Sequence, residues 1–192
     1  LVTVLSLTAM VVQVFGAAPD LRVQHRRPAA AAILQDGRVL CVANRRSGTV
    51  SLIDTVQWTV SEKQIGQELS DIVSLPDGNE LLVSDFAAGV VVVLRIVDGQ
   101  LAIVDRVDVA SSPVSISANE TGSFACVASL WSRRLTILER KRSDIPERRI
   151  VRKKHQIDLP FAPRASAFVD ASRVVVADSF GGRFAVVDCA AG

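Results

Sequence analysis

Histidine is scarce in this sequence, and the short motifs that mark common enzyme active sites are missing. The only two histidines, His25 and His155, lie at unrelated places along the chain. Histidine supplies many metal ligands and general bases, so this scarcity argues against a catalytic dyad or a histidine-based metal site. The G-x-S-x-G, P-loop, dinucleotide-binding and haem-attachment motifs are also absent. We therefore predict no catalytic residue, no metal ligand and no cofactor within these 192 residues.

The sequence also lacks an excess of charge of one sign. Lys and Arg number 22 against 20 Asp and Glu, which gives a formal net charge of +2, whereas nucleic-acid-binding domains have a clear basic excess. One segment, 140–154, carries eight basic and two acidic residues. It could dock on an anionic membrane surface or an acidic protein, or be a long exposed hairpin connection that its charges keep soluble. No aromatic residues interleave these charges, so we expect no nucleic acid as a partner.

Helical patterning is missing after position 20, where no window shows a convincing apolar stripe of 3.6-residue period. The apolar residues are mostly Val, Ala, Leu and Ile in short runs. β-Branched side chains pack well on a pleated surface, so these runs favour strands. The chain is long enough to bury one sizeable core. We therefore predict an all-β fold with little helix.

Residues 1–18 carry no charge and are almost wholly apolar. Small residues at Gly16 and Ala18 suit a signal-peptidase site, although the positively charged segment that usually precedes the apolar region is missing. An uncleaved membrane anchor is the alternative, because about 18 apolar residues just suffice to span a bilayer. We expect an exported protein, periplasmic, cell-surface or secreted, whose mature chain comprises 19–192. Membrane contact is expected only through 1–18 or the basic segment 140–154.

One unit of forty-odd residues recurs four times along the chain. Its polar turn residues, spaced by 41, 44 and 49 positions, are Asn44, Asp85, Ser129 and Asp178. The residues that start the first strand of each unit precede these turn residues by 16, 16, 16 and 15 positions and are Pro28, Leu69, Pro113 and Pro163. A period in the forties with several short strands per unit is typical of propeller blades.

Each unit divides into four antiparallel strands. The second strand is a nearly continuous apolar run, which predicts burial on both faces between neighbouring sheets. The fourth is more polar, as suits an outer edge exposed to solvent. The predicted blades span 28–68, 69–112, 113–162 and 163–192, and the last of these ends after its third strand. The third unit departs most from the pattern, because residues 139–154 form an enlarged polar insert.

The run from Val42-Ala43-Asn44 through Gly48 to Leu52-Ile53-Asp54 resembles the YVTN-type β-propeller repeat, as does 163–188 with Val176-Ala177-Asp178 and Val186-Val187-Asp188. The resemblance covers 28–188. It implies about four four-stranded blades belonging to a larger ring, since propellers of this kind commonly have about seven blades. A closed four-bladed ring, with 21–24 completing the last blade, stays open as an alternative. An unclosed ring would expose two apolar sheet faces.

In the strand order that this resemblance implies, the loops after the second strands lie on one face, together with the loops that enter the first strands. Arginine forks and an aromatic ring on this face could grip a carboxylate, a phosphate or an acidic protein surface. The predicted ligand-binding residues are Arg45, Arg46, Asp85, Trp131, Arg133, Arg134, Arg164, Asp178 and Arg183, with Arg26 and Arg27 nearby. The alternative is ordinary solvated loops in which Asp85 and Asp178 only form turns.

The three cysteines form no C-x-x-C pair. Cys41 and Cys126 occupy the same place in units that are not adjacent, too far apart for a disulfide, so we expect buried thiols that pack as small hydrophobes. Cys189 is predicted to be free or partnered by something outside the sequence.

Three functions remain as hypotheses. The first is a non-catalytic propeller scaffold that binds a protein or a small anionic ligand. The second is the propeller portion of an oxidoreductase joined to a c-type cytochrome or di-haem peroxidase-like module, the only case in which haem is expected. The third is a lactonase-like propeller hydrolase.

Overall fold

The computed structural model describes residues 25–76, 78–142 and 149–191, and almost all of its regular structure is β-strand. One short 3-10 helix, η1 (Gln35–Gly37), follows the first strand. The strands are β1 (Pro28–Leu34), β2 (Val39–Asn44), β3 (Thr49–Asp54), β4 (Val60–Gln64), β5 (Leu69–Ser74), β6 (Glu80–Asp85), β7 (Val90–Val97), β8 (Gln100–Asp108), β9 (Pro113–Ala118), β10 (Phe124–Ser129), β11 (Arg134–Arg142), β12 (Arg149–Asp158), β13 (Pro163–Phe168), β14 (Arg173–Asp178) and β15 (Phe184–Asp188).

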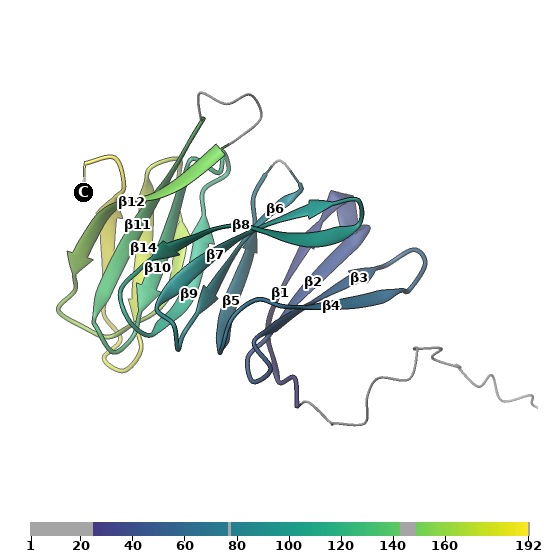
Figure 1. The fold of residues 1–192 in the computed structure, drawn as a ribbon. Coiled ribbons are helices and arrows are strands. Elements are labelled where there is room, and N and C mark those ends of the chain that lie inside the picture. Colours follow the sequence, from purple (N-terminus) through teal and green to yellow (C-terminus); the bar gives the residue numbers. More distant parts are fainter. Residues whose placement is uncertain (1–24, 77, 143–148, 192) are drawn as a thin grey trace, which may run out of the picture.

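Each repeat folds into one antiparallel sheet whose strands pair in chain order. The sheets are β1–β4, β5–β8, β9–β12 and the three-stranded sheet β13–β15. They stand side by side like a fan, with β1–β4 at one end and β13–β15 at the other (Figure 1). The first strands of successive sheets, β1, β5, β9 and β13, contact one another in that order. The predicted all-β architecture of propeller-like blades is confirmed.

The same hydrogen bond closes each sheet on the face where its first strand begins. In every sheet, the turn after the second strand donates a backbone N–H to the residue that enters the first strand. The four bonds, of 2.8 to 3.0 Å, are Arg45 N–H to Arg27 O, Phe86 N–H to Glu68 O, Leu130 N–H to Ser112 O and Ser179 N–H to Ala162 O. The loops entering the first strands and the turns after the second strands therefore lie together, as the sequence predicts.

The core consists of three apolar layers, each between two neighbouring sheets. The first layer contains Cys41 and Leu94, the second Leu82 and Ile116, and the third Ile137 and Phe161. Polar contacts also join the inner strands, because the Ser70 hydroxyl of β5 donates to the Pro113 carbonyl at 2.6 Å. The stability of each sheet therefore depends on the sheet beside it.

The last sheet departs from the predicted burial. Both faces of β6 are covered along its whole length. By contrast, two of the six residues of β14 are exposed and two more are only partly buried, and β15 alternates between exposed and partly buried residues. The prediction that every second strand is buried on both faces is wrong for β14. The physical reason is that no fifth sheet lies beyond it among the described residues.

The polar insert predicted at 139–154 is mostly paired strand. β11 and β12 are long, and they stay in register as far as Arg142 opposite Arg149. Arg140 lies inside the molecule rather than on a solvated loop, with 4% of its side chain exposed. The described part of this segment is therefore paired strand, in which Arg140 is buried whereas Lys141, Arg152 and Lys153 are exposed. Residues 143–148 lie outside the described residues.

Residues 1–18, predicted to be a signal peptide or anchor, lie outside the described residues, as do 21–24. Among the described residues, no helix has the length and hydropathy needed to cross a membrane.

Candidate functional site

A pocket of about 220 Å³ opens on the face where the inner strands begin, and residues from all four sheets line it. We call it the inner-strand pocket. Its lining residues are Arg27, Pro28, Ala29, Arg45, Ser70, Val114 and Arg164. Four of them, Ala29, Ser70, Val114 and Arg164, occupy the second position of β1, β5, β9 and β13. The repeat therefore brings four equivalent positions to one place.

Backbone hydrogen bonds fix the two arginines that the first sheet contributes. Arg27 enters β1, and Arg45 lies in the turn between β2 and β3, where its N–H bonds the Arg27 carbonyl at 2.9 Å. Arg27 has a φ of +51°, a left-handed conformation that is unusual for a residue with a side chain. The two guanidinium groups therefore start from adjacent, hydrogen-bonded backbone.

Gly48 allows the turn that carries Arg45 to pack closely on the next connection. It has a φ of +67°, and a Cβ at this position would lie 2.1 Å from the Gly66 carbonyl oxygen. Its own carbonyl accepts the N–H groups of Ile65 and Gly66, each at 2.9 Å. Only glycine fits this approach, so the turn is held in one place relative to the entry of the second sheet.

The pocket carries positive charge that the protein balances only in part. Arg45 pairs with Glu68 at 2.7 Å, and its guanidinium carbon lies 5.0 Å from the centre of the Phe86 ring. Within the described part of the chain, neither Arg27 nor Arg164 has an ion-pair partner, and both are exposed. None of the described residues that line the pocket has an acidic side chain. The site is therefore suited to an anion.

Asp85 and Asp178, both predicted on this face, end β6 and β14 and bond nearby backbone. Asp85 is fully buried. Its carboxylate accepts N–H groups of Gln67 at 2.7 Å, Glu68 at 3.2 Å, and Ala87 and Ala88 at 3.1 Å. Asp178 accepts the Phe180 N–H at 3.1 Å. In the described structure both carboxylates hold turns, and neither lines the inner-strand pocket.

The other predicted residues lie on the same face but outside the pocket. Arg46 and Arg133 are exposed in their turns, and Arg134 pairs with Asp158 at 2.7 Å. Trp131 is 65% exposed and stacks on Phe180 with the ring centres 6.4 Å apart. Arg183 pairs with Asp178 at 3.0 Å and lies over the Phe161 ring. Of the nine predicted residues, Arg45 and Arg164 line the inner-strand pocket and the other seven do not.

The stability of the turn that contains Phe180, beside Trp131, depends on pH through the Asp178 carboxyl group. Burial raises the pKa of its carboxyl, but hydrogen bonds from the Phe180 N–H and the Arg183 guanidinium outweigh burial and hold the pKa below its ordinary value. Ionised Asp178 therefore contributes stability above the pKa of the unfolded chain, and this contribution is lost as pH falls through the folded pKa. We expect Asp178→Asn to have a lower free energy of unfolding than wild type near pH 6, and this difference should narrow below about pH 4. Urea unfolding followed by circular dichroism at both pH values measures this difference. An equal difference at the two pH values would contradict the prediction.

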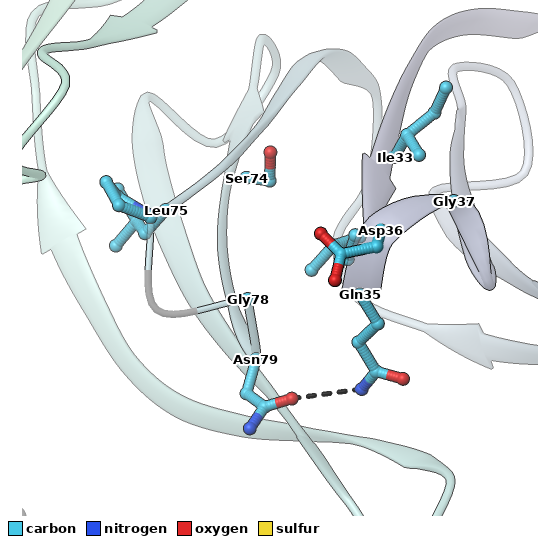
Figure 2. A pocket seen from close by; sticks show the side chains of 10 residues that line it. Ile33, Gln35, Asp36, Gly37, Ser74, Leu75, Gly78 and Asn79 are labelled. Carbon is cyan, nitrogen blue, oxygen red and sulfur yellow. Dashed lines mark hydrogen bonds between the residues drawn. The ribbon is translucent and has the colours of Figure 1, made fainter.

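A second hollow, of about 560 Å³, lies on the opposite face, between η1 and the turn after β5. Figure 2 shows Gln35 and Asn79 reaching toward each other across one end of it, and the Gln35 amide donates to the Asn79 Oδ1 at 3.0 Å. Among the described residues that line it, Asp36 has the one carboxylate and none is an arginine. Although this hollow is larger, it lacks the convergent like charges that distinguish the inner-strand pocket.

Ala29, Ser70 and Val114 line the pocket but were not predicted from the sequence. Each follows directly on the residue that starts the first strand of its repeat, as Arg164 follows Pro163. That shared offset is the signal that would have found them. Turn residues stand out in a sequence because they are polar, whereas Val114 does not.

No protein-family model matches the chain, and no curated protein matches it. The hydrazine synthase of Kuenenia stuttgartiensis is similar in structure, with 19% identity, a TM-score of 0.73 and coverage of 92% of this chain and 50% of that chain. The β-propeller domain of Cps50 (Swd1) from Myceliophteria thermophila is 14% identical, with a TM-score of 0.67 and coverage of 83% and 52%. A protein from Bacteroides uniformis, provisionally assigned as a 6-phosphogluconolactonase, is 13% identical, with a TM-score of 0.71 and coverage of 84% and 50%.

At these identities the similarity establishes the fold alone. Together with the four fanned antiparallel sheets, it defines the class: this chain has a β-propeller fold. The chain spans about half the length of the solved structures that it matches.

Proposed function

We propose that this chain is part of a YVTN-like β-propeller, exported from the cell, that acts as a non-catalytic scaffold and binds an anionic group in the inner-strand pocket. The ligand would present a carboxylate or phosphate, either as a small molecule or on an acidic protein surface. The observation that carries the proposal is the convergence of Arg27, Arg45 and Arg164 on one pocket of about 220 Å³.

The chemistry of the pocket favours binding over catalysis. Guanidinium groups present several N–H donors in a planar fork that matches carboxylate and phosphate oxygens. The described residues of the lining include no histidine, cysteine, aspartate or glutamate that would act as a base or nucleophile. Ser70 has the one hydroxyl in the described lining, and it already donates its hydrogen bond to the Pro113 carbonyl. These residues would hold and orient an anion without transforming it.

A larger ring would place this pocket near the central axis. The inner strands β1, β5, β9 and β13 all contribute to the pocket, and inner strands surround the axis of a propeller. Apolar side chains lie exposed on the last sheet, where Phe184 is 70% and Val186 57% exposed. Further blades on this side would cover them, in keeping with matched structures about twice as long.

Titration calorimetry with inorganic phosphate and with citrate tests the proposal. We expect saturable binding to wild type that weakens as salt rises, because exposed charges are screened. Arg164→Ala should weaken binding about 10-fold or more, the effect of losing charge-assisted hydrogen bonds worth roughly 1.5–3 kcal/mol.

The matched control is Arg38→Ala. Arg38 is also exposed, but it follows η1, at the opposite ends of the inner strands. This variant removes the same charge and should bind both anions as wild type does. Equal weakening in the two variants would show only a general effect of net charge and would contradict a site at the pocket.

The oxidoreductase and hydrolase alternatives rest on resemblance. A C-x-x-C-H motif encoded beside this segment in the complete gene would favour a cytochrome-linked enzyme, and turnover of a lactone by the purified protein would favour the hydrolase. Either finding would replace the scaffold proposal.

A further inference from the structure

Two thiols face each other across the boundary between the third and fourth sheets. Cys126 lies in β10, and Cys189 follows the end of β15, 63 positions later. Their Sγ atoms are 3.3 Å apart, little more than an ångström longer than a disulfide bond of about 2.05 Å. Both side chains are fully buried in the apolar layer that joins the two sheets.

The third cysteine provides an internal comparison. Cys41 has the same place in β2 that Cys126 has in β10, opposite Leu52 as Cys126 lies opposite Ile137. The position in the second repeat that corresponds to Cys189 holds Ile96, which packs against the layer that contains Cys41. The same two positions therefore belong to one apolar layer at the first and at the third boundary between sheets, and only at the third are both of them cysteine.

We infer that Cys126 and Cys189 form a disulfide when the protein meets an oxidant of the disulfide class, R–S–S–R. The Cys189 thiol loses its proton and attacks one sulfur, which forms a mixed disulfide and expels one R–S⁻. The Cys126 thiol then loses its proton and attacks the Cys189 sulfur, which expels the second R–S⁻. The two thiolates take up the two protons, so two protein thiols are oxidised and one R–S–S–R is reduced to two R–SH.

The surroundings of Cys189 suit it to the first step. The hydrogen bond from Cys126 holds the pKa of the Cys189 thiol below its ordinary value, and the nearby Lys154 charge acts in the same direction. The Lys154 ammonium donates to the Cys189 carbonyl at 3.1 Å and to the Ala190 carbonyl at 2.8 Å. Cys189 lies in a turn beside the exposed Ala190, so a small opening of this turn exposes its sulfur.

The bond would fasten the sheet that has the least support. The fourth sheet has three described strands and one open face. Closing a covalent loop of 63 positions restricts the unfolded chain, for which we expect a rise in Tm on the order of 10 °C. Such bonds persist in oxidising compartments, so a disulfide here would add to the case for export. Its formation does not depend on the proposed ligand.

The test incubates the folded protein with oxidised glutathione, denatures it, and labels free thiols with N-ethylmaleimide before intact mass measurement. We expect one label on the oxidised protein, at Cys41, and three after reduction. Cys41→Ala should then carry no label before reduction and two after it, and Cys189→Ala should carry two labels throughout. The Tm of wild type and Cys41→Ala should fall on reduction, and that of Cys189→Ala should not.

Three labels on oxidised wild type would overturn the inference, as would a peptide map that joins Cys41 to either partner. All three cysteines are fully buried, so circular dichroism checks that Cys189→Ala and Cys41→Ala fold, and the label count on wild type tests the inference without any substitution.

Discussion

Replacing Glu80 with glutamine is expected to lower the free energy of unfolding by about 1.5–3 kcal/mol, the effect of weakening the charge-assisted hydrogen bonds of a buried carboxylate. Glu80 in β6 lies opposite Arg95 of β7 and binds its guanidinium, and it also binds Arg140 of β11 in the next sheet. The exposed fractions of the Glu80 and Arg140 side chains are 7% and 4%. The neutral amide leaves the Arg140 charge buried without this carboxylate.

Asp158→Asn is the matched control, since Asp158 also forms an ion pair with an arginine. That pair is on the surface, where 81% of the Asp158 side chain is exposed. Surface pairs contribute about 0–1 kcal/mol. Urea unfolding measures the free energy of unfolding of both variants. If Glu80→Gln lowers it no more than Asp158→Asn does, the buried pair does not hold the second and third sheets together.

Val93→Ala is expected to cost about 2 kcal/mol, and Val186→Ala about 0.5 kcal/mol or less, although the two valines occupy equivalent positions. Val93 lies opposite Leu82 in the second sheet, and Val186 lies opposite Val175 in the fourth. Val93 is 3% exposed, because the third sheet covers it, and Val186 is 57% exposed. The same substitution therefore leaves a cavity in one sheet and removes solvated methyl groups from the other.

Chemical unfolding of both variants in this chain and in the complete protein gives a direct comparison. If further blades cover the fourth sheet in the complete protein, the cost of Val186→Ala should rise there toward that of Val93→Ala. A cost that stays small in the complete protein would contradict the proposal of a larger ring. If the two substitutions lower the free energy of unfolding equally in this chain alone, the fourth sheet does not have an open face.

The fold could be predicted from the sequence because turn residues and apolar runs recur at regular intervals along the chain. The turn residues Asn44, Asp85, Ser129 and Asp178 each end a second strand, as their regular spacing indicates. Alternating and continuous apolar runs also identify which strands are inner and which are edges. Burial at the last sheet could not be predicted in this way, because the apolar pattern of β14 is the same whether or not a neighbour covers it.

The site was predicted only in part, because turn residues and pocket residues are different sets. The sequence places Arg45 and Trp131 on one face, but only the radial arrangement of the sheets brings Arg45 near Arg164 and leaves Trp131 outside the pocket. Contacts between repeats were harder still to predict from the sequence. Cys126 and Cys189 lie in different units, and Glu80 meets Arg140 across 60 positions. Such pairs depend on which positions face each other across a layer, which neither residue type nor local spacing reveals.

Crystallising the protein with selenate would show where an anion binds, because the selenium of this dianion can be located by its anomalous scattering. We expect a selenate in the inner-strand pocket, between the guanidinium groups of Arg27, Arg45 and Arg164, and its loss in Arg164→Ala but not in Arg38→Ala. Selenate bound elsewhere on the molecule, with the pocket empty, would contradict it.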